Sequence, residues 1–358
     1  MFAVIMAGGA GTRFWPVSRR RRPKQFLSIT GKNPMVVETS DRLLPLIPEE
    51  QMVVVLGREH WEEARELFEK RRVEILAEPR GRNTAPCIGL GALYARHRGW
   101  TAPLAFLPAD HFIGDPSAFL EGLRRAGRIA GAGGIVTLGI VPNRPETGYG
   151  YIRKGAACSP ADGGTVFEAA AFVEKPDLDK ARQYLARGDY LWNAGIFVAT
   201  AETILEEIKE YLPGLHGGLR RLEGLFGSEG FEEELERVYD ELEAVSFDYG
   251  VMERTGNPVY VLPCDCGWSD VGSWASLYEL RKEERDGKGN LTQGDSLLVD
   301  CENSYVANQG SRLLACIGLR NCLVVDTGDA LLVADLDKSQ EVREIIKRLR
   351  EKGRDELL

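Results

Sequence analysis

A buried strand that breaks directly into a glycine loop opens the chain, and this feature constrains the fold most strongly. Residues 2–6 are uninterrupted apolar sequence, and Gly8, Gly9 and Gly11 follow at once. A glycine loop at the end of a strand exposes backbone N–H groups and lets a ligand approach the main chain closely. The opening segment therefore predicts a strand whose end faces a ligand.

Positive charge gathers beside this loop, although the chain is acidic overall, with a formal net charge of −9. Arg13, the four arginines at 19–22 and Lys24 all precede the first carboxylate, Glu38. A local cationic segment next to a glycine loop favours a polyanionic ligand, most simply a nucleoside triphosphate. The alternative is an ordinary tight turn beside a solvated basic face.

Two common phosphate-binding motifs do not fit this segment. The dinucleotide-binding fingerprint needs a third glycine where Phe14 stands. The P-loop needs Gly-Lys-Ser/Thr to close the loop, and that sequence does not occur. What remains is Gly-Gly-x-Gly-Thr-Arg, with Lys24 eleven residues after Arg13.

This segment, AGGAGTRFWPVSRRRRPKQF, resembles the signature of nucleotidyltransferases that activate sugar phosphates, and most closely that of the mannose-1-phosphate guanylyltransferases. The resemblance covers nearly the entire chain. It implies GTP and mannose 1-phosphate as substrates and Mg²⁺ as cofactor. It also implies catalytic roles for Arg13 and Lys24. The nucleotide contacts that it implies in this segment are Ala7, Gly8, Gly9, Gly11, Thr12 and Arg13.

Strands and helices alternate through the first 140 residues. Apolar strands are predicted at 52–56, 73–76, 104–107 and 135–139, and helices at 59–70, 83–98 and 116–130. Near-continuous apolar strands alternating with helices are typical of a parallel sheet covered on both faces, and ligands bind at the carboxyl ends of such strands. We therefore predict an α/β fold with a Rossmann-like, mostly parallel sheet, which the resemblance describes as GT-A-like.

The loop at 78–86, EPRGRNTAP, follows a strand and opens a helix. Backbone donors at the helix start, with Arg80 and Arg82, could receive a base or a phosphate. The alternative is a capped helix with surface arginines. The resemblance implies that Asn83 and Thr84 contact the nucleobase.

Two aspartates are candidates for a metal site. Asp110 follows a buried strand, and Asp270 lies in the segment GWSDVGSW. Mg²⁺ takes one or two carboxylates and completes its shell with phosphates and water. Either residue could instead be a cap, Asp110 of a turn and Asp270 of a helix starting near Gly272. The resemblance implies that both hold one Mg²⁺ and that Asp110 also contacts the nucleotide. We assign no catalytic role to His111.

The residue pattern of the sequence changes after Val141. Three segments combine glycine or small residues with a few polar side chains, as sugar recognition requires. The resemblance implies that Gly148, Glu174 and Asn193 contact sugar hydroxyls and that Lys175 contacts the sugar phosphate. The alternative for Glu174 and Lys175 is an exposed ion pair of negligible stability. The strongly acidic helical region at 200–245 is interpreted as a solvated face.

Five short apolar runs repeat every seven to ten residues after residue 290, with turn residues between them. This spacing predicts a small all-β unit such as a short β-helix, and a helix predicted at 339–352 closes the chain. We predict a catalytic domain at 1–286 and a β-helix-like domain at 287–358. The open ends of so short a β-helix favour a homodimer. Bifunctional members of the family carry an isomerase domain beyond this point, so no isomerase activity is expected.

The composition of the chain indicates its cellular compartment and argues against some classes of partner. Seven cysteines embedded in apolar runs favour free thiols in a reducing cytoplasm. No apolar run is long enough to span a membrane, and no signal peptide is visible. The basic cluster is local and the chain acidic, so a nucleic-acid partner is not expected.

Two alternatives to the guanylyltransferase reaction stay open. One is a nucleotidyltransferase for another nucleoside triphosphate and sugar 1-phosphate, because hydrogen bonding in the pocket sets this choice. The other is a non-catalytic regulatory subunit of the same fold. Such a subunit is expected to lack one of Arg13, Lys24, Asp110 and Asp270, and all four are present.

Overall fold

The structure is a computed structural model that describes residues 1–9, 11–158 and 165–358. The chain divides into two compact units. The first, here called the sheet unit, consists of Met1–Gly8, Val36–Ala109 and Ile113–Trp268. The second, here called the C-terminal unit, consists of Gly9–Met35, Asp110–Phe112 and Ser269–Leu358.

Within the described residues, the sheet unit is built on one sheet of nine strands in the order β3-β2-β1-β4-β9-β6-β10-β8-β7. The strands are β1 (Phe2–Ala7), β2 (Met52–Gly57), β3 (Glu74–Glu78), β4 (Leu104–Pro108), β6 (Ile135–Ile140), β7 (Gly150–Cys158), β8 (Val166–Glu174), β9 (Tyr190–Ala199) and β10 (Val259–Pro263). The two-residue strands β5 (Phe112–Ile113) and β11 (Trp268–Ser269) lie outside this sheet.

Parallel pairing is concentrated in the first half of the sheet. β1 pairs in parallel with β2 and β4, and β2 pairs in parallel with β3. β10 is parallel to β6, whereas β7, β8 and β9 pair antiparallel with their neighbours. The first five residues of β2 are all buried, which explains why this strand reads as continuous apolar sequence. The predicted α/β class is confirmed.

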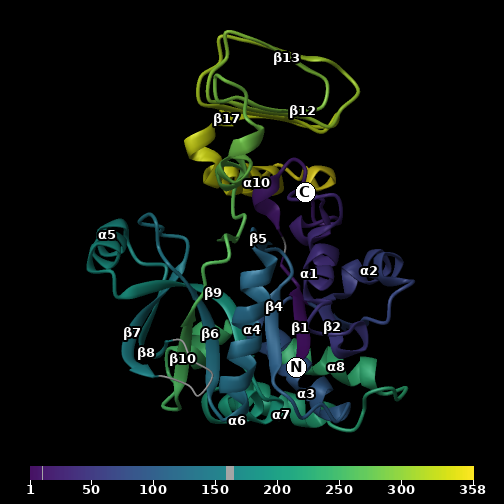
Figure 1. Ribbon diagram of the computed structural model, residues 1–358. Coiled ribbons are helices and arrows are strands. Elements are labelled where there is room, and N and C mark those ends of the chain that lie inside the picture. The colour runs from purple at the N-terminus through teal and green to yellow at the C-terminus, as the bar shows by residue number, and fades with distance from the viewer. Residues whose placement is uncertain (10, 159–164) are drawn as a thin grey trace. The chain divides into compact units, whose positions relative to one another are not determined.

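Helices cover the sheet, as Figure 1 shows. α3, α6, α7 and α8 share one apolar core with β1, β2 and β4, and α4 packs on β6 and β9. The helices are α1 (Met35–Leu43), α2 (Trp61–Phe68), α3 (Thr84–His97), α4 (Pro116–Gly131), α5 (Leu178–Arg187), α6 (Ala201–Tyr211), α7 (Pro213–Leu222), α8 (Phe231–Glu241) and the π-helix η5 (Asp248–Met252).

Capping side chains explain two of the predicted helix starts. The side chain of Asn83 accepts a hydrogen bond from the Thr84 N–H at 2.9 Å, and α3 begins there. Asp115 accepts one from the Ala118 N–H at 3.0 Å, with Pro116 in the first turn of α4. Both arrangements satisfy backbone donors that a helix N-terminus leaves unpaired. The helices predicted at 83–98 and 116–130 are therefore confirmed.

The C-terminal unit carries a short β-helix, drawn in Figure 1 as stacked turns. Leu291 lies opposite Tyr305, and Tyr305 opposite Leu323, in parallel register. β13 and β15 form a second parallel pair, and β17 closes the first sheet antiparallel to β16. The β-helix-like fold is confirmed. Its strands are β12 (Leu291–Gln293), β13 (Ser296–Val299), β14 (Tyr305–Asn308), β15 (Leu314–Ile317), β16 (Cys322–Asp326) and β17 (Leu331–Asp335).

The segment after the glycine loop packs into the same unit. Phe14 and Trp15 are buried in a core that includes Trp274, and the Trp15 indole donates to the Leu357 carbonyl at 2.8 Å. Arg19 donates to the same carbonyl at 2.5 Å and pairs with Asp329 at 3.0 Å. The interpretation of the arginine run as part of a ligand site is therefore wrong for Arg19, which holds this segment on the β-helix.

Short helices complete the C-terminal unit. They are η1 (Thr12–Phe14), η2 (Lys24–Phe26), α9 (Trp274–Leu280), η6 (Lys282–Glu284), η7 (Leu336–Glu341), α10 (Val342–Glu351) and η8 (Asp355–Leu357).

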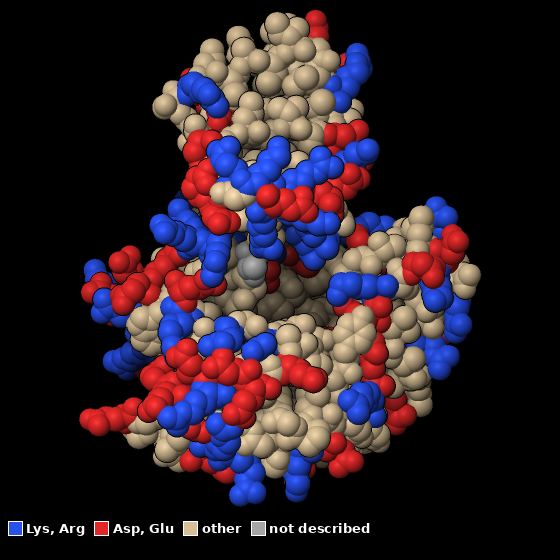
Figure 2. Space-filling view, turned by 180° about the vertical axis from the view of Figure 1, so that it is seen from behind, with Lys and Arg blue, Asp and Glu red and all other residues tan. Residues whose placement is uncertain are grey.

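Charges of both signs are interspersed on the molecular face drawn in Figure 2. Ion pairs between such charges occur in the sheet unit, for example between Arg58 and both Glu232 and Glu236. None of the seven cysteines forms a disulfide. Nowhere in the described ranges does a helix have both the length and the apolar composition that crossing a bilayer requires.

Candidate active site

The glycine loop turns tightly against the backbone of Lys24. Gly11 has a φ of 55°, in the left-handed region. A Cβ at this position would lie 2.3 Å from the backbone nitrogen of Lys24, which no side chain could tolerate. The amide of Gln25 donates to the Gly9 carbonyl at 2.8 Å and holds the other side of the loop. Glycine is required at Gly11 for both its φ and this close approach.

Lys24 connects three separate segments of the chain. Its side chain is buried, and Nζ donates to Oδ2 of Asp110 at 2.9 Å and to the backbone carbonyl of Asp270 at 2.5 Å. Asp110 and Asp270, which lie 86 and 246 positions after Lys24 in the sequence, thus both bind its ammonium group. Two oxygen acceptors fix the position of this cation.

The pKa of Asp110 lies below its ordinary value. Burial favours the neutral acid, but attraction to Lys24 and His111 and the hydrogen bond from Lys24 outweigh burial. The carboxyl group is therefore an anion at neutral pH. Its side chain is 37% exposed, so it stays accessible to a ligand.

Asp270 lies in a tight turn rather than at a helix start. Its Oδ1 accepts a hydrogen bond from the Gly272 N–H at 3.0 Å, and Val271 has a φ of 45°. Ser273 is the N-cap of α9, in a capping box with Ser276. The alternative of Asp270 as a helix N-cap is therefore wrong.

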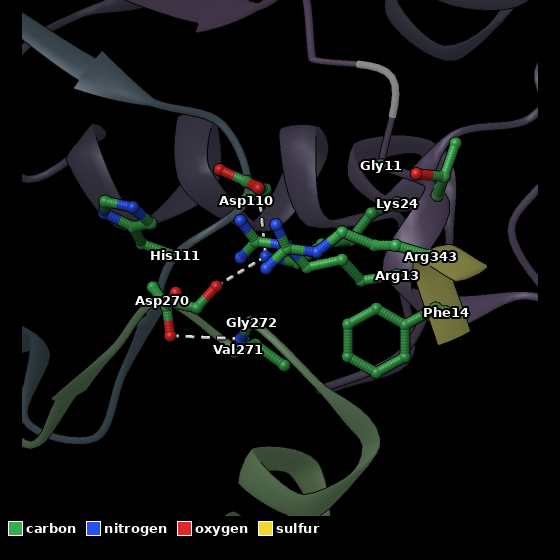
Figure 3. Close-up of a pocket in the computed structure, with 11 residues that line it drawn as sticks. Gly11, Arg13, Phe14, Lys24, Asp110, His111, Asp270, Val271, Gly272 and Arg343 are labelled. Carbon is green, nitrogen blue, oxygen red and sulfur yellow. Dashed lines mark hydrogen bonds and ion pairs between the residues drawn. The ribbon is translucent and has the colours of Figure 1, made fainter. Parts of the chain in front are cut away.

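These residues line one pocket of about 410 Å³, a volume within the range of small-ligand sites. The four predicted catalytic residues, Arg13, Lys24, Asp110 and Asp270, all border it (Figure 3). Among the residues that the structure describes, the lining is Gly11, Thr12, Arg13, Phe14, Lys24, Asp110, His111, Asp270, Val271, Gly272 and Arg343, all of the C-terminal unit. Three permanent cations and two carboxylates therefore share one pocket.

Arg343 is the lining residue that sequence reasoning missed. It lies in the first turn of α10, in a helix whose sequence reads as an ordinary amphipathic terminal segment. No local signal distinguishes Arg343 from the other basic residues of α10.

The donor set of this pocket fits a hard divalent cation. Asp110 and Asp270 offer oxygen ligands, as Mg²⁺ prefers. No cluster of three or more His, Cys, Asp or Glu side chains suited to a metal occurs among the described residues. A cation between two carboxylates would therefore take its other ligands from phosphates and water.

The predicted base contacts lie in the sheet unit, at the start of α3. Asn83 has a φ of 70° and caps the helix, and the Thr84 hydroxyl accepts a hydrogen bond from the Phe247 N–H at 2.9 Å. The neighbouring arginines are engaged: Arg80 pairs with Glu236 at 3.3 Å, and Arg82 donates to the Tyr239 carbonyl at 2.8 Å. These two arginines hold the loop in place.

Glu78 is a buried carboxyl at the end of β3. It is 2% exposed, and Tyr239 donates to its Oε1 at 2.9 Å. Burial raises the pKa of Glu78 to about 7, although hydrogen bonds from Tyr239 and Cys87 oppose the rise. A Cβ on Gly8 would lie 3.1 Å from its Oε2, so the carboxyl group backs the first glycine of the loop.

Two predicted sugar contacts, Glu174 and Asn193, line a second pocket within the sheet unit, which is too narrow in this structure to hold a water molecule. The other residues lining it are Gly150, Tyr151, Phe172, Val173, Asp248 and Glu253. Lys175 is 54% exposed and forms an ion pair with Glu174. Gly148 does not line this pocket, and its N–H donates to Glu146 at 3.0 Å.

Asp248 is a further polar residue of the second pocket that sequence reasoning missed. The Asn193 amide donates to its Oδ1 at 2.7 Å. Burial and the nearby Glu174 charge raise the pKa of Asp248 to about 6. It lies in the π-helix η5, and such helices often occur at functional sites.

Two family models together match most of the chain. A family model described as Nucleotidyl transferase matches residues 2–287. A second, described as MannoseP isomerase/GMP-like beta-helix domain, matches residues 294–349.

Two curated relatives extend over the whole chain. The xanthan biosynthesis protein XanB of Xanthomonas campestris pv. campestris (strain B100) is 42% identical over 357 residues, which cover 99% of this chain and 74% of that protein. The mannose-1-phosphate guanylyltransferase of Escherichia coli (strain K12) is 42% identical over 361 residues, which cover 99% of this chain and 75% of that protein.

A solved structure has the same architecture throughout. The crystal structure of a mannose-1-phosphate geranyltransferase from Thermus thermophilus matches with a TM-score of 0.86 and 37% identity. The match covers 98% of this chain and 99% of that one. The chain belongs to the nucleotidyl transferase family and, within it, to the mannose-1-phosphate guanylyltransferases.

Proposed function

We propose that this protein transfers the guanylyl group of GTP to mannose 1-phosphate and releases pyrophosphate. One observation carries the proposal: the ammonium group of Lys24 is buried and held by Asp110 and Asp270, in a pocket that Gly11 and Arg13 also line. A fixed cation beside a glycine loop suits the charge that develops on a reacting phosphate. The relatives named mannose-1-phosphate guanylyltransferase support the choice of substrates.

In the proposed reaction, a phosphate oxygen of mannose 1-phosphate forms a bond to the α-phosphorus of GTP. The bond from that phosphorus to the oxygen bridging to the β-phosphate breaks, and pyrophosphate leaves with the electron pair. The nucleophile is already an anion, so no general base is needed. Catalysis then rests on positioning and charge neutralisation.

The chain's own cations supply that neutralisation. Lys24 stabilises the negative charge at the α-phosphate, because its two acceptors hold Nζ in place. Arg13 binds the leaving phosphates. We assign further nucleotide contacts to Ala7, Gly8, Gly9, Gly11 and Thr12.

Asp110 and Asp270 are the residues that would hold Mg²⁺. Their shared pocket and the anionic state of Asp110 support this assignment. When bound, the ion would offset phosphate charge and orient the phosphates.

The sheet unit is proposed to bind the base and the sugar. Asn83 and Thr84 are assigned to the guanine, supported by their position at a helix start. Glu174 and Asn193 are assigned to sugar hydroxyls, since both line the second pocket. Gly148 is also assigned to the sugar hydroxyls, and Lys175 is assigned to the sugar phosphate.

We also propose a homodimer in a reducing, cytoplasmic compartment, without nucleic-acid or membrane partners. Leu297, Val299 and Ile317 on the paired strands β13 and β15 are 55%, 45% and 74% exposed, and apolar side chains grouped in this way favour protein contacts. The free thiols support the compartment. We also propose a domain boundary after residue 286. The family models support it, because they match residues 2–287 and 294–349.

Pyrophosphate release tests the proposed reaction. Purified protein is assayed with Mg²⁺ and mannose 1-phosphate against GTP, ATP, UTP and dTTP in parallel, and then with glucose 1-phosphate. Release with GTP and mannose 1-phosphate well above every other pair is the expected result. Release with a different pair would replace the substrates, and no release from folded protein would favour a non-catalytic subunit.

A further inference from the structure

Arg343 brings a cation from the C-terminal helix into the pocket of Lys24. Figure 3 shows its side chain and that of Arg13 extending toward Lys24 and Asp110. Arg13 and Arg343 come from opposite ends of the sequence, yet both line this pocket. Their separation in the sequence means that only the fold can bring the two guanidinium groups to one site.

The backbone of Arg343 is firmly placed. The preceding residue, Val342, is 3% exposed and Ile346 is 6% exposed, and both belong to the core of the C-terminal unit. The Ser339 hydroxyl accepts a hydrogen bond from the Ala275 N–H at 3.2 Å, which joins the segment before α10 to α9. The packing of α10 places the exposed side chain of Arg343 at the pocket.

Many arginine side chains elsewhere in the described chain pair with carboxylates. Arg221, for example, pairs with Glu234 and Glu241, both at 2.6 Å. In the part of the chain that the structure describes, neither Arg13 nor Arg343 has a hydrogen-bond acceptor or an ion-pair partner. Asp110 is already engaged by Lys24.

The pocket holds three basic side chains against two aspartates, and an anionic ligand would offset this excess of positive charge. Guanidinium groups present paired donors that match phosphate oxygens bidentately. Two guanidinium groups without protein acceptors therefore fit a ligand with several phosphate oxygens better than a single phosphate.

We propose that Arg343 binds the β- and γ-phosphates of the nucleotide and, after the reaction, the pyrophosphate product. This assignment rests on the proposed function and adds to it a substrate contact from the C-terminal unit. In this account the β-helix and its closing helix do more than support the fold, because they carry a group that touches the substrate.

Steady-state kinetics of Arg343→Ala and Arg343→Lys test the assignment, with Arg348→Ala as the matched control. Arg348 is an exposed arginine of the same helix and is not among the residues that line the pocket. We expect Arg343→Ala to raise the KM for GTP and the inhibition constant of pyrophosphate by about 10- to 100-fold. The KM for mannose 1-phosphate should stay near the wild-type value, and Arg343→Lys should recover part of the loss.

Unchanged constants for GTP and pyrophosphate in Arg343→Ala would overturn the proposal, as would an effect confined to mannose 1-phosphate. An equal effect in Arg348→Ala would overturn it as well. If the alanine variant has a lowered melting temperature, Arg343→Gln is judged by the same two constants.

Calorimetric titration with inorganic pyrophosphate separates this proposal from the proposed function. Wild-type protein that binds pyrophosphate more tightly than Arg343→Ala, but turns over no substrate pair, would contradict only the proposed function. Active wild-type protein with equal pyrophosphate affinity in both variants would contradict only the role of Arg343.

Discussion

The ammonium of Lys24 lies 2.9 Å from Oδ2 of Asp110. This pair joins the segment after the glycine loop to the residue that follows β4, within one compact unit. Asp110 is thereby kept ionised, and Lys24 is kept at a fixed position. The same contact thus serves both the proposed metal site and the proposed contact with the α-phosphate.

Replacement of Lys24 by alanine should abolish most activity. We expect Lys24→Ala to lower kcat by about 10²-fold or more, because a fixed charge that stabilises the transition state is lost. Turnover is measured beside Lys32→Ala, a variant of an exposed lysine that lies outside the pocket. Near-wild-type turnover of Lys24→Ala would remove this residue from its assigned role.

Replacement of either pocket aspartate should change the metal requirement. Asp110→Asn and Asp270→Asn each remove one anionic ligand, so we expect kcat to fall by about 10²-fold and half-maximal activity to need more Mg²⁺. Activity is measured against Mg²⁺ concentration, and chelation of divalent cations should abolish wild-type turnover. Asp300→Asn, at an exposed position with a φ of 51° that asparagine tolerates, is the control. An unshifted Mg²⁺ dependence in both variants would contradict the metal assignment.

Glu78 should make stability depend on pH. Its pKa is raised to about 7, against about 4.3 in an unfolded chain, so the folded protein holds this proton more tightly. The stabilisation is complete below about pH 4 and is lost as the pH rises through about 7. The Glu78→Gln variant has no carboxyl group to titrate, so it does not lose this stability. The difference between the free energy of unfolding of the variant and that of the wild type should therefore rise by up to about 3 kcal/mol from about pH 5 to about pH 8.

Urea unfolding across this pH range measures the effect. Glu283→Gln, whose side chain is 89% exposed in the wild-type protein, should show no such trend. A relative stability of Glu78→Gln that falls as the pH rises would show that the carboxyl group is ionised and favourably paired in the folded state.

Replacement of Asp248 should weaken the binding of mannose 1-phosphate without changing the binding of GTP. Asp248→Asn keeps an oxygen that can accept the Asn193 hydrogen bond but loses the negative charge, so we expect the KM for mannose 1-phosphate to rise by about tenfold at neutral pH. The pKa of about 6 predicts that the wild-type KM also rises as the pH falls below 6. The phosphate of mannose 1-phosphate titrates in the same pH range. Because the Asp248→Asn variant binds the same titrating substrate but lacks the carboxyl group, it serves as the control. A matching rise in the KM for GTP would contradict a role confined to the sugar.

Much of the fold follows from local patterns in the sequence. Asn83 caps the helix that it was predicted to cap, and the five apolar runs after residue 290 became five strands. The directions of β7, β8 and β9 could not be predicted in this way, because parallel and antiparallel neighbours are fixed by how the chain crosses the sheet, not by the residues of one strand.

The site was predictable only where a family pattern marked it. Arg13, Lys24, Asp110 and Asp270 were identified by resemblance, and they line one pocket. Arg343 was missed because it occurs in a segment that resembles an ordinary surface helix. Asp248 was missed because its position beside Asn193 depends on tertiary packing. The charge of Arg19 suggested a ligand, but a carbonyl and a carboxylate of the same unit engage it.

The central claim is that the α-phosphorus of GTP is transferred to the sugar phosphate. The most direct test follows radioactive phosphorus from α-labelled and γ-labelled GTP, with mannose 1-phosphate and Mg²⁺, in wild-type protein and in Lys24→Ala. The account predicts that the α-label appears in GDP-mannose and the γ-label in pyrophosphate, and that both products decline together in the variant. The γ-label in a sugar product, or release of both labels as free nucleotide and phosphate without GDP-mannose, would contradict it.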